Sequence, residues 1–365
     1  MPFFTRAADS ESGDEQAKTA SPQDDTKHTP WPVAVGLGLA VSVLVGLVAA
    51  AFLWPITTGS PQHVPLAIAG PAPAVSVVED QLAAQDEDLF DLTEVADRDA
   101  AVEAIEKREV VGAIVVGPET EILTTSAGNP QVAQMLAKIG EAMEAAQAGQ
   151  AAPPAGGQPG AEQPGAGQQP PTVKVTDVVP AGSVSVAANL TMMPGLIGGM
   201  AGAVVSLLVV RTPIRRFATL AAVATAGGLV GAAVLGPWFD VLQGNYWLAA
   251  AALGMGILAI SSFISGLGTM LGRGGMVLGI LTIFFIANPW AGLFAPREFL
   301  SEPMGTIGAY MPNGTFVDLL RSISFFPDAP TGGHWLVLAI WAGAGLLMLG
   351  IGAALQHRRT ARQTV

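Results

Sequence analysis

The chain has 365 residues, of which 50% are hydrophobic and only 13% charged, about half the charge of an average soluble domain. This composition argues against an ordinary soluble enzyme, and the formal net charge of −12 argues against a nucleic-acid-binding protein, which needs a basic face. The absence of cysteine excludes disulfides, thiolate nucleophiles, iron–sulfur clusters and cysteine-type zinc sites.

Six uncharged apolar runs are long enough to cross a bilayer, whose core requires about 20 apolar residues in a helix. They cover residues 31–54, 189–210, 217–239, 246–271, 276–294 and 335–355. Buried core helices of a soluble protein are usually shorter and amphipathic, and the first run is too long for the apolar region of a cleaved signal peptide. We therefore expect a polytopic α-helical membrane protein with six transmembrane helices.

The basic residues of the short loops predict the orientation of these helices. Two arginines, Arg297 and Arg321, fall on one side of the runs, and seven fall on the other. The seven are Arg211, Arg215, Arg216, Arg273, Arg358, Arg359 and Arg362. We expect their side to be the cytoplasm of a multi-pass protein of the cell membrane. A disordered acidic tail (residues 1–30) and a basic tail (residues 356–365) would then both be cytoplasmic.

Residues 55–188 would lie outside the cell, and they contain 18 Asp and Glu against 5 Lys and Arg. Such an acidic surface is typical of a solvated domain, and also of one that attracts cations or a cationic substrate. Residues 55–147 predict an extracytoplasmic α/β domain between the first and second helices. Residues 148–171, which contain only Ala, Gly, Gln, Pro and one Glu, predict a flexible linker. A strand in residues 172–188 would lead back to the five-helix domain, residues 189–355, which includes an outer loop at residues 288–334.

Within the α/β domain, alternating helices and strands are expected. Strands are predicted at residues 64–69, 89–95, 112–117 and 119–125, and Pro65 would confine the first to a sheet edge. Helices are predicted at residues 73–84, from Asp97 or Asp99 through Glu109, and from the Asn129–Pro130 start signal. The last helix carries an apolar stripe that would pack either on the sheet or on a partner: Val132, Met135, Leu136, Ile139 and Met143.

Common catalytic motifs are missing from the sequence. No lysine stands in the G-K-[ST] context of a nucleotide-binding loop, no G-x-S-x-G motif occurs, and the four histidines lack metal-ligand spacing. The apolar runs contain none of the ionisable residues that a proton relay needs. We therefore expect no catalytic, cofactor or metal site and no enzyme activity of the chain's own.

Small residues recur in the second and third runs and permit close helix approach. They are Gly195, Gly198, Gly199, Gly202, Gly227 and Gly231. Packing within the chain, a seam between two copies and a sliding helix are all consistent with this pattern.

The layout of one run, a large outside domain and five more runs resembles the export-class (type-2) permeases of ABC transporters and the phage-infection-protein-like membrane proteins. The segment from Ala101 to Pro118, a helix, a basic turn and an apolar strand ending in Pro, is similar to the outside-domain signature of that family. The outer loop is also similar, with Asn288–Pro289, the run Met311-Pro-Asn-Gly314 and Leu319-Leu-Arg321. The resemblance implies that this loop forms short helices that dip back from the outer face.

The resemblance implies a permease subunit that exports a hydrophobic or amphipathic compound, works as a homodimer or heterodimer in the membrane lipid and is powered by a separate cytoplasmic ATP-binding subunit. It implies that Arg211, Arg215, Arg216 and Arg273 face the ATPase, although positive charge that only sets topology explains them as well. It also implies an outer gate of unwound backbone at Asn288, Pro289, Pro312 and Asn313, for which an ordinary loop is the alternative. The alternative function is a non-transporting envelope protein whose outside domain binds a partner or surface ligand.

Overall fold

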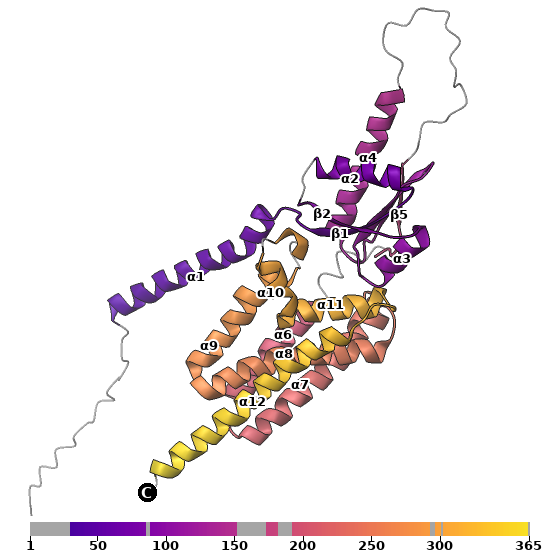
Figure 1. Cartoon of the computed structure of the whole chain (residues 1–365). Coiled ribbons are helices and arrows are strands. Elements are labelled where there is room, and N and C mark those ends of the chain that lie inside the picture. Colours follow the sequence, from indigo (N-terminus) through magenta and orange to yellow (C-terminus); the bar gives the residue numbers. More distant parts are fainter. Residues whose placement is uncertain are drawn as a thin grey trace, which may run out of the picture. The chain divides into compact units, whose positions relative to one another are not determined.

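The computed structural model describes residues 30–84, 88–151, 173–181, 192–292, 296–300 and 302–363. Contacts divide the chain into two units, Met1–Leu47 and Val48–Val365, and the boundary falls inside helix α1 (Trp31–Thr58). The second unit contains a small α/β sheet domain and a group of apolar helices (Figure 1).

The described part of the chain has three helical segments long and apolar enough to cross a membrane: Pro213–Trp238, Tyr246–Leu271 and Gly332–Arg358. The first is α7 (Pro213–Ala233) with the π-helical turn η2 (Val234–Trp238), the second is α8 (Tyr246–Leu271), and the third lies in α12 (Gly332–Gln363). The other three predicted runs contain the helix α1, whose bounds are Trp31–Thr58, and the shorter apolar helices Met193–Leu208 and Arg273–Ala287.

The described part of helix α6 (Met192–Leu208) has 17 residues, about 25 Å at 1.5 Å per residue. Helix α9 (Arg273–Leu281) continues as the π-helical turn η3 (Thr282–Ala287) and ends at Asn288–Pro289, because proline cannot supply the next backbone donor.

Helix α8 is the central element of the helical part, since it packs against α6, α7, α9, α11 and α12. Small residues allow these approaches: a Cβ at Gly228 of α7 would meet the backbone of α8 at Ala250 and Gly254. A Cβ at Gly199 of α6 would meet the side chain of Ile260, and a Cβ at Gly227 of α7 would meet the side chain of Ile257, both on α8. Of the interpretations of the glycine pattern, these contacts support packing within the chain.

The α/β domain is built on a five-stranded sheet of order β2-β1-β3-β4-β5, in which only the β3–β4 pair is antiparallel. Its elements, in chain order, are β1 (Val64–Ala69), α2 (Ala72–Ala83), β2 (Phe90–Glu94), α3 (Arg98–Glu106), β3 (Gly112–Val115), β4 (Thr120–Thr124), α4 (Pro130–Ala151) and β5 (Val173–Asp177). The predicted strands and helix starts are confirmed, including the cap at Asn129, whose side chain accepts from Gln131 and Val132.

Alternating side chains of the strands bury two faces of this sheet. The stripe of α4 packs through Val132 and Leu136 against Leu66 and Ile122, so the sheet and not a partner covers it. Helix α3 packs on the opposite face, where Ile105 joins a cluster with alanines and Leu123. Both faces of the sheet are therefore covered by helices, as parallel strands require.

Three predictions for this domain are wrong in detail. Strand β1 pairs with both β2 and β3 and is therefore not an edge strand. Pro65 is compatible with this position because the ladder with β3 begins only at Leu66. The carbonyl of Pro65 still accepts a hydrogen bond from the backbone N–H of Val111. Asp97 caps α3, but the helix ends at Glu106 and not at Glu109, since Arg108 adopts a positive φ of 59° and turns the chain toward β3. Helix α4 extends to Ala151, into the predicted linker, whose residues 152–171 lie outside the described part.

The segment predicted as an outer loop, hereafter the 288–334 segment, is mostly helical. It contains η4 (Pro289–Ala291), η5 (Arg297–Phe299), α10 (Met304–Tyr310) and α11 (Pro312–Phe325). Helix α11 is almost wholly buried and contacts α6, α8 and α12. Its Phe316 is 0% exposed because it fills the space left by Gly195 of α6 and Gly256 of α8.

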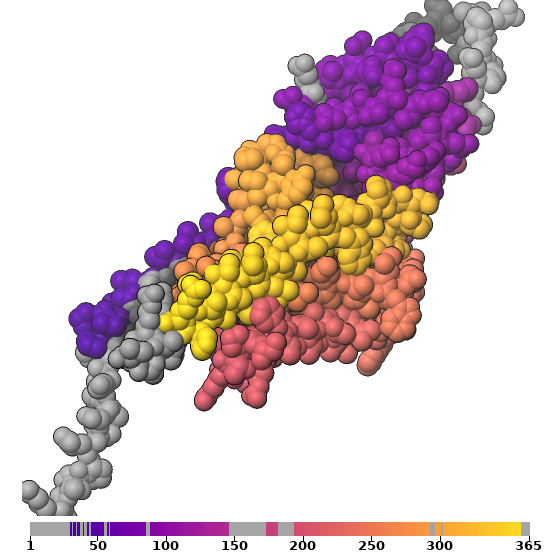
Figure 2. Space-filling model, turned by 60° about the horizontal axis from the view of Figure 1, so that its bottom comes forward, coloured from indigo at the N-terminus to yellow at the C-terminus, as the bar shows by residue number. Residues whose placement is uncertain are grey.

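Helix α12 provides a matched test of the close packing on α8, and it lies on the face of the molecule seen in Figure 2. A Cβ at Gly345 would meet the backbone of Ser262 and Phe263, whereas a Cβ at Gly343, on the same helix, meets nothing within 4 Å. We expect Gly345→Ala to destabilise the protein by about 1–3 kcal/mol through overpacking. Thermal unfolding in mild detergent should show this as a lower melting temperature. Gly343→Ala should leave the temperature unchanged or raise it, and an equal loss in both variants would contradict the packing argument.

Candidate functional site

The four arginines predicted to face an ATPase lie at one end of the helical part. Arg216 donates to the carbonyl of Val210 at 3.0 Å and to Oγ1 of Thr269, near the end of α8, at 3.0 Å. The carbonyl of Thr269 also accepts from Gln356 of α12 at 2.7 Å, which gathers the α6–α7 turn and the ends of α8 and α12. Arg273 begins α9 four residues further on. Arg211, Arg215 and Arg273 are exposed, whereas Arg216 is half-buried and bonded to its own chain.

The four residues predicted to form an outer gate are buried, and the elements that carry them, η4 and α11, contact each other. Asn288 is 2% and Asn313 0% exposed, and Pro289 and Pro312 are buried at the starts of η4 and α11. Asn313 donates to the carbonyl of Ile283 at 3.4 Å, and the Oδ1 atoms of both asparagines have no hydrogen-bond partner among the described residues. This packed arrangement differs from an ordinary surface loop.

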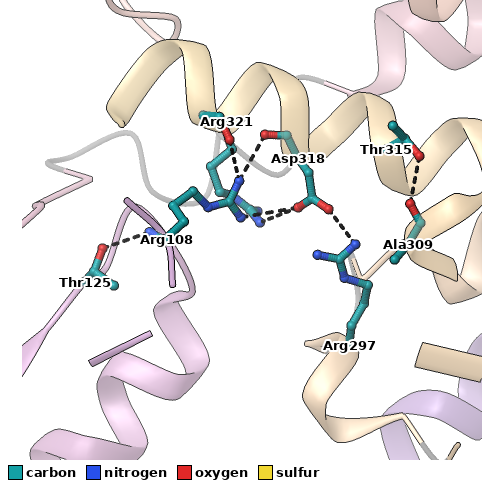
Figure 3. Close-up of polar contacts among 9 residues, drawn as sticks. Arg108, Thr125, Arg297, Ala309, Thr315, Asp318 and Arg321 are labelled. Atoms are coloured by element: carbon teal, nitrogen blue, oxygen red, sulfur yellow. Dashed lines mark hydrogen bonds and ion pairs between the residues drawn. The ribbon is translucent and has the colours of Figure 1, made fainter. Parts of the chain in front are cut away.

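A site that the sequence did not predict lies where the α/β domain meets the 288–334 segment (Figure 3). Its centre is Asp318 of α11, whose Oδ2 pairs with Arg297 of η5 at 2.5 Å and whose Oδ1 pairs with Arg108 at 3.4 Å. Arg321, one turn further along α11, stands 4.0 Å from Oδ1. We call Arg108, Arg297, Asp318 and Arg321 the junction cluster.

Arg108 connects the α/β domain to the 288–334 segment. It follows α3, and its guanidinium donates to the Asp318 carbonyl at 3.1 Å and to the Ser322 hydroxyl at 2.7 Å. The same guanidinium lies 5.4 Å from the centre of the Phe326 ring, within the range of a cation–π contact. The positive φ of Arg108 therefore directs a charged side chain of the α/β domain onto one face of α11.

The electrostatics of the cluster follow from its burial. The side chains of Asp318 and Arg321 are only 7% and 14% exposed. Burial alone would raise the pKa of Asp318, but the charges of Arg297, Arg108 and Arg321 outweigh it and hold that pKa below its ordinary value. Burial, with the nearby charge of Arg108, lowers the pKa of Arg321 to about 10, so the cluster carries three positive charges and one negative charge at pH 7.

Apolar contacts surround the ionic ones. Ala127 and Ala181 of the α/β domain cluster with Phe326 and Ala329 of the 288–334 segment. Before β1, the backbone N–H of Gln62 donates to the backbone carbonyl of Glu298 at 2.8 Å. The domain is thus attached to the 288–334 segment by charge, packing and backbone hydrogen bonding together.

A cavity of about 300 Å³ opens beside the cluster. Its lining takes Lys107, Arg108 and Asn129 from the α/β domain and Arg297, Arg321 and His334 from beyond residue 290. This volume is at the lower end of the range typical of small-molecule sites.

A second hollow lies on α7 and α8 and is almost wholly apolar. It has a volume of about 580 Å³ and is lined by small residues and by the larger side chains of Leu229, Trp247, Met255, Leu258 and Trp335. Because both helices belong to candidate membrane spans, this groove suits an apolar molecule or a lipid chain.

The sequence contained a weak signal for the junction cluster. Arg297 and Arg321 were the two exceptions to the charge asymmetry of the loops, and Asp318 is the single acid of α11. An acid and a base three residues apart in an otherwise uncharged helix indicate burial with a counter-ion. The partner Arg108, 210 residues away in sequence, was not predictable from spacing.

No protein-family model, curated protein or solved structure matches the chain. The function must therefore be inferred from the residues and their arrangement.

Substituting Arg108 tests whether the junction cluster holds the α/β domain and the 288–334 segment together. Arg108→Met removes the bonds to Asp318 and Ser322 but keeps the apolar stem, and we expect a loss of about 2 kcal/mol, as is usual for charged hydrogen bonds. Hydrogen exchange should increase in α11 and in the turn before β3. Lys107→Met is the control, because Lys107 pairs with Glu103 on its own helix. Equal exchange in both variants would show that the cluster does not fasten the junction.

Proposed function

We propose that the protein is the permease subunit of an ABC-type exporter that moves a hydrophobic or amphipathic compound out of the cell, powered by a separate ATPase. The observation that carries this proposal is α11. It is a short helix that begins at Pro312 and is buried among α6, α8 and α12. Its Asp318 pairs with Arg108 of the α/β domain. A movement of the membrane helices would therefore be transmitted to the α/β domain through one rigid element.

The remaining parts of the proposal have separate supports. The six-helix topology with both termini in the cytoplasm rests on the apolar runs and on the loop arginines. The cytoplasmic ATPase would contact Arg211, Arg215 and Arg273, which are exposed, while Arg216 braces the same turn against α8. The outer gate would consist of the short helical turns at Asn288, Pro289, Pro312 and Asn313, where irregular backbone is buried in protein.

The apolar groove on α7 and α8 supports an apolar cargo. It offers a concave surface without a charged side chain, as a compound arriving from the bilayer would need. Two copies of the permease, or one copy and a related chain, would face each other across the transport path.

The alternative function, partner binding by the outside domain without transport, has less support. It rested on the apolar stripe of α4 and on the long linker of residues 148–171, and the stripe packs on the sheet. The linker remains its argument.

A pull-down of the tagged full chain from its native membrane in mild detergent tests the proposal. We expect a stoichiometric nucleotide-binding subunit with vanadate-sensitive ATP hydrolysis. Reversing three exposed charges, in Arg211→Glu with Arg215→Glu and Arg273→Glu, should reduce the recovery of that subunit about tenfold, because like charges oppose binding.

The control is Arg98→Glu, which reverses an exposed arginine that pairs with Glu121 in the α/β domain and should leave recovery unchanged. Recovery of an extracytoplasmic partner and of no nucleotide-binding subunit would favour the alternative function and contradict the permease.

A further inference from the structure

The cavity beside the junction cluster has an excess of positive charge that the chain does not neutralise. Four basic side chains line it (Lys107, Arg108, Arg297 and Arg321) against two acidic ones (Glu298 and Asp318); Glu103 neutralises Lys107, which leaves an excess of one positive charge with His334 neutral. Buried charges are normally paired, because desolvation without a counter-ion is costly. An excess of positive charge, carried by three arginines in a partly enclosed cavity, is the pattern expected for an anion site.

The surroundings make this excess more significant. Residues 55–188 carry 18 acidic and 5 basic side chains, so most of the domain repels anions. Two of those five basic residues, Lys107 and Arg108, line the cavity, and Arg297 and Arg321 come from the 288–334 segment. The positive charge is therefore concentrated at one point of an otherwise acidic domain.

The chemistry of the lining indicates which anion fits. Three guanidiniums come from three different parts of the chain, and arginine forks match the oxygen geometry of phosphate. Nδ1 of His334 is buried, lines the same region and has no hydrogen-bond partner among the described residues. The Phe326 ring supplies an apolar wall beneath Arg108.

We propose that the junction cavity binds a phosphate group, either of a soluble phosphate compound or of a lipid headgroup. The group's oxygens accept from Arg108 and Arg321, while Asp318 keeps Arg297 in place. Because Arg108 belongs to the α/β domain and Arg321 to α11, the bound phosphate bridges the two and tightens the junction. This binding goes beyond the proposed transport and does not require it.

Binding is measured on the purified full chain in an uncharged detergent, by calorimetric titration with inorganic phosphate against sodium chloride of equal ionic strength. A second titration uses vesicles of phosphatidylcholine, with or without phosphatidic acid, and the reconstituted chain. Saturable binding of inorganic phosphate identifies a soluble ligand, and binding that requires phosphatidic acid identifies a lipid headgroup. No saturable binding in either experiment would overturn the proposal.

Charge variants separate a phosphate site from a purely structural cluster. Arg321→Gln should raise the Kd about tenfold, as loss of one charged hydrogen bond predicts. Glu298→Gln should lower the Kd severalfold, because it removes a lining carboxylate whose side chain makes no ion pair among the described residues. Arg98→Gln, which alters an arginine outside the cavity, should leave the Kd unchanged.

Weaker binding in a folded Glu298→Gln variant would overturn the proposal. The measurement involves no ATPase and no transport, so its failure would leave the permease proposal untouched, and the reverse also holds.

Discussion

The arrangement of the second unit depends on one buried carboxylate. Asp318 is 7% exposed and holds two arginines at ion-pair distance from two separate segments, with a third arginine one turn away on its own helix. A carboxylate at such a position would be neutral if it were alone, since burial favours the protonated form. The three guanidiniums keep it ionised, and in return it fixes the positions of η5, of α11 and of the turn that carries Arg108.

A second constraint, close helix packing, connects this cluster to the membrane helices. Helix α11 reaches the middle of the helical part because glycines of α6 and α8 leave room for Phe316. Along the same α8, glycines of α7 and α12 bring their backbones into contact with its own. The polar junction and the apolar packing thus share one helix: one face of α11 pairs with Arg108 and another fills the space between α6 and α8.

These two constraints give the proposed function its physical form. A permease must transmit a change that begins at one end of its helices to the other end, and the exposed arginines and the junction cluster lie on different elements joined by α8 and α12. The phosphate site, if occupied, would add a ligand to the same pathway, because it touches both the α/β domain and α11. An apolar groove on α7 and α8 and a basic cavity at the junction together suit molecules with an apolar part and an anionic head.

Local features of the fold were predictable from the sequence. The apolar runs predicted the helices, and three of them are long and apolar enough to span a membrane. The strands of the α/β domain and the caps at Asp97 and Asn129 followed from alternation and from short polar side chains at helix starts. Such features depend on neighbours in the chain, so local rules are sufficient for them.

Only the tertiary structure decided the rest, because it depends on residues far apart in the chain. Pro65 is compatible with the interior strand β1 because the ladder between β1 and β3 starts one residue later, at Leu66. No local sequence pattern contains this register. The resemblance implied short helices in the 288–334 segment, but the burial of α11 depends on Gly195 and Gly256, which leave the space for Phe316. The junction cluster joins Arg108 to Asp318 across 210 residues, and sequence spacing carries no information about which basic residue neutralises a buried acid. The sequence by itself determined the helices, the strands and their caps, and the three-dimensional packing determined which charges meet.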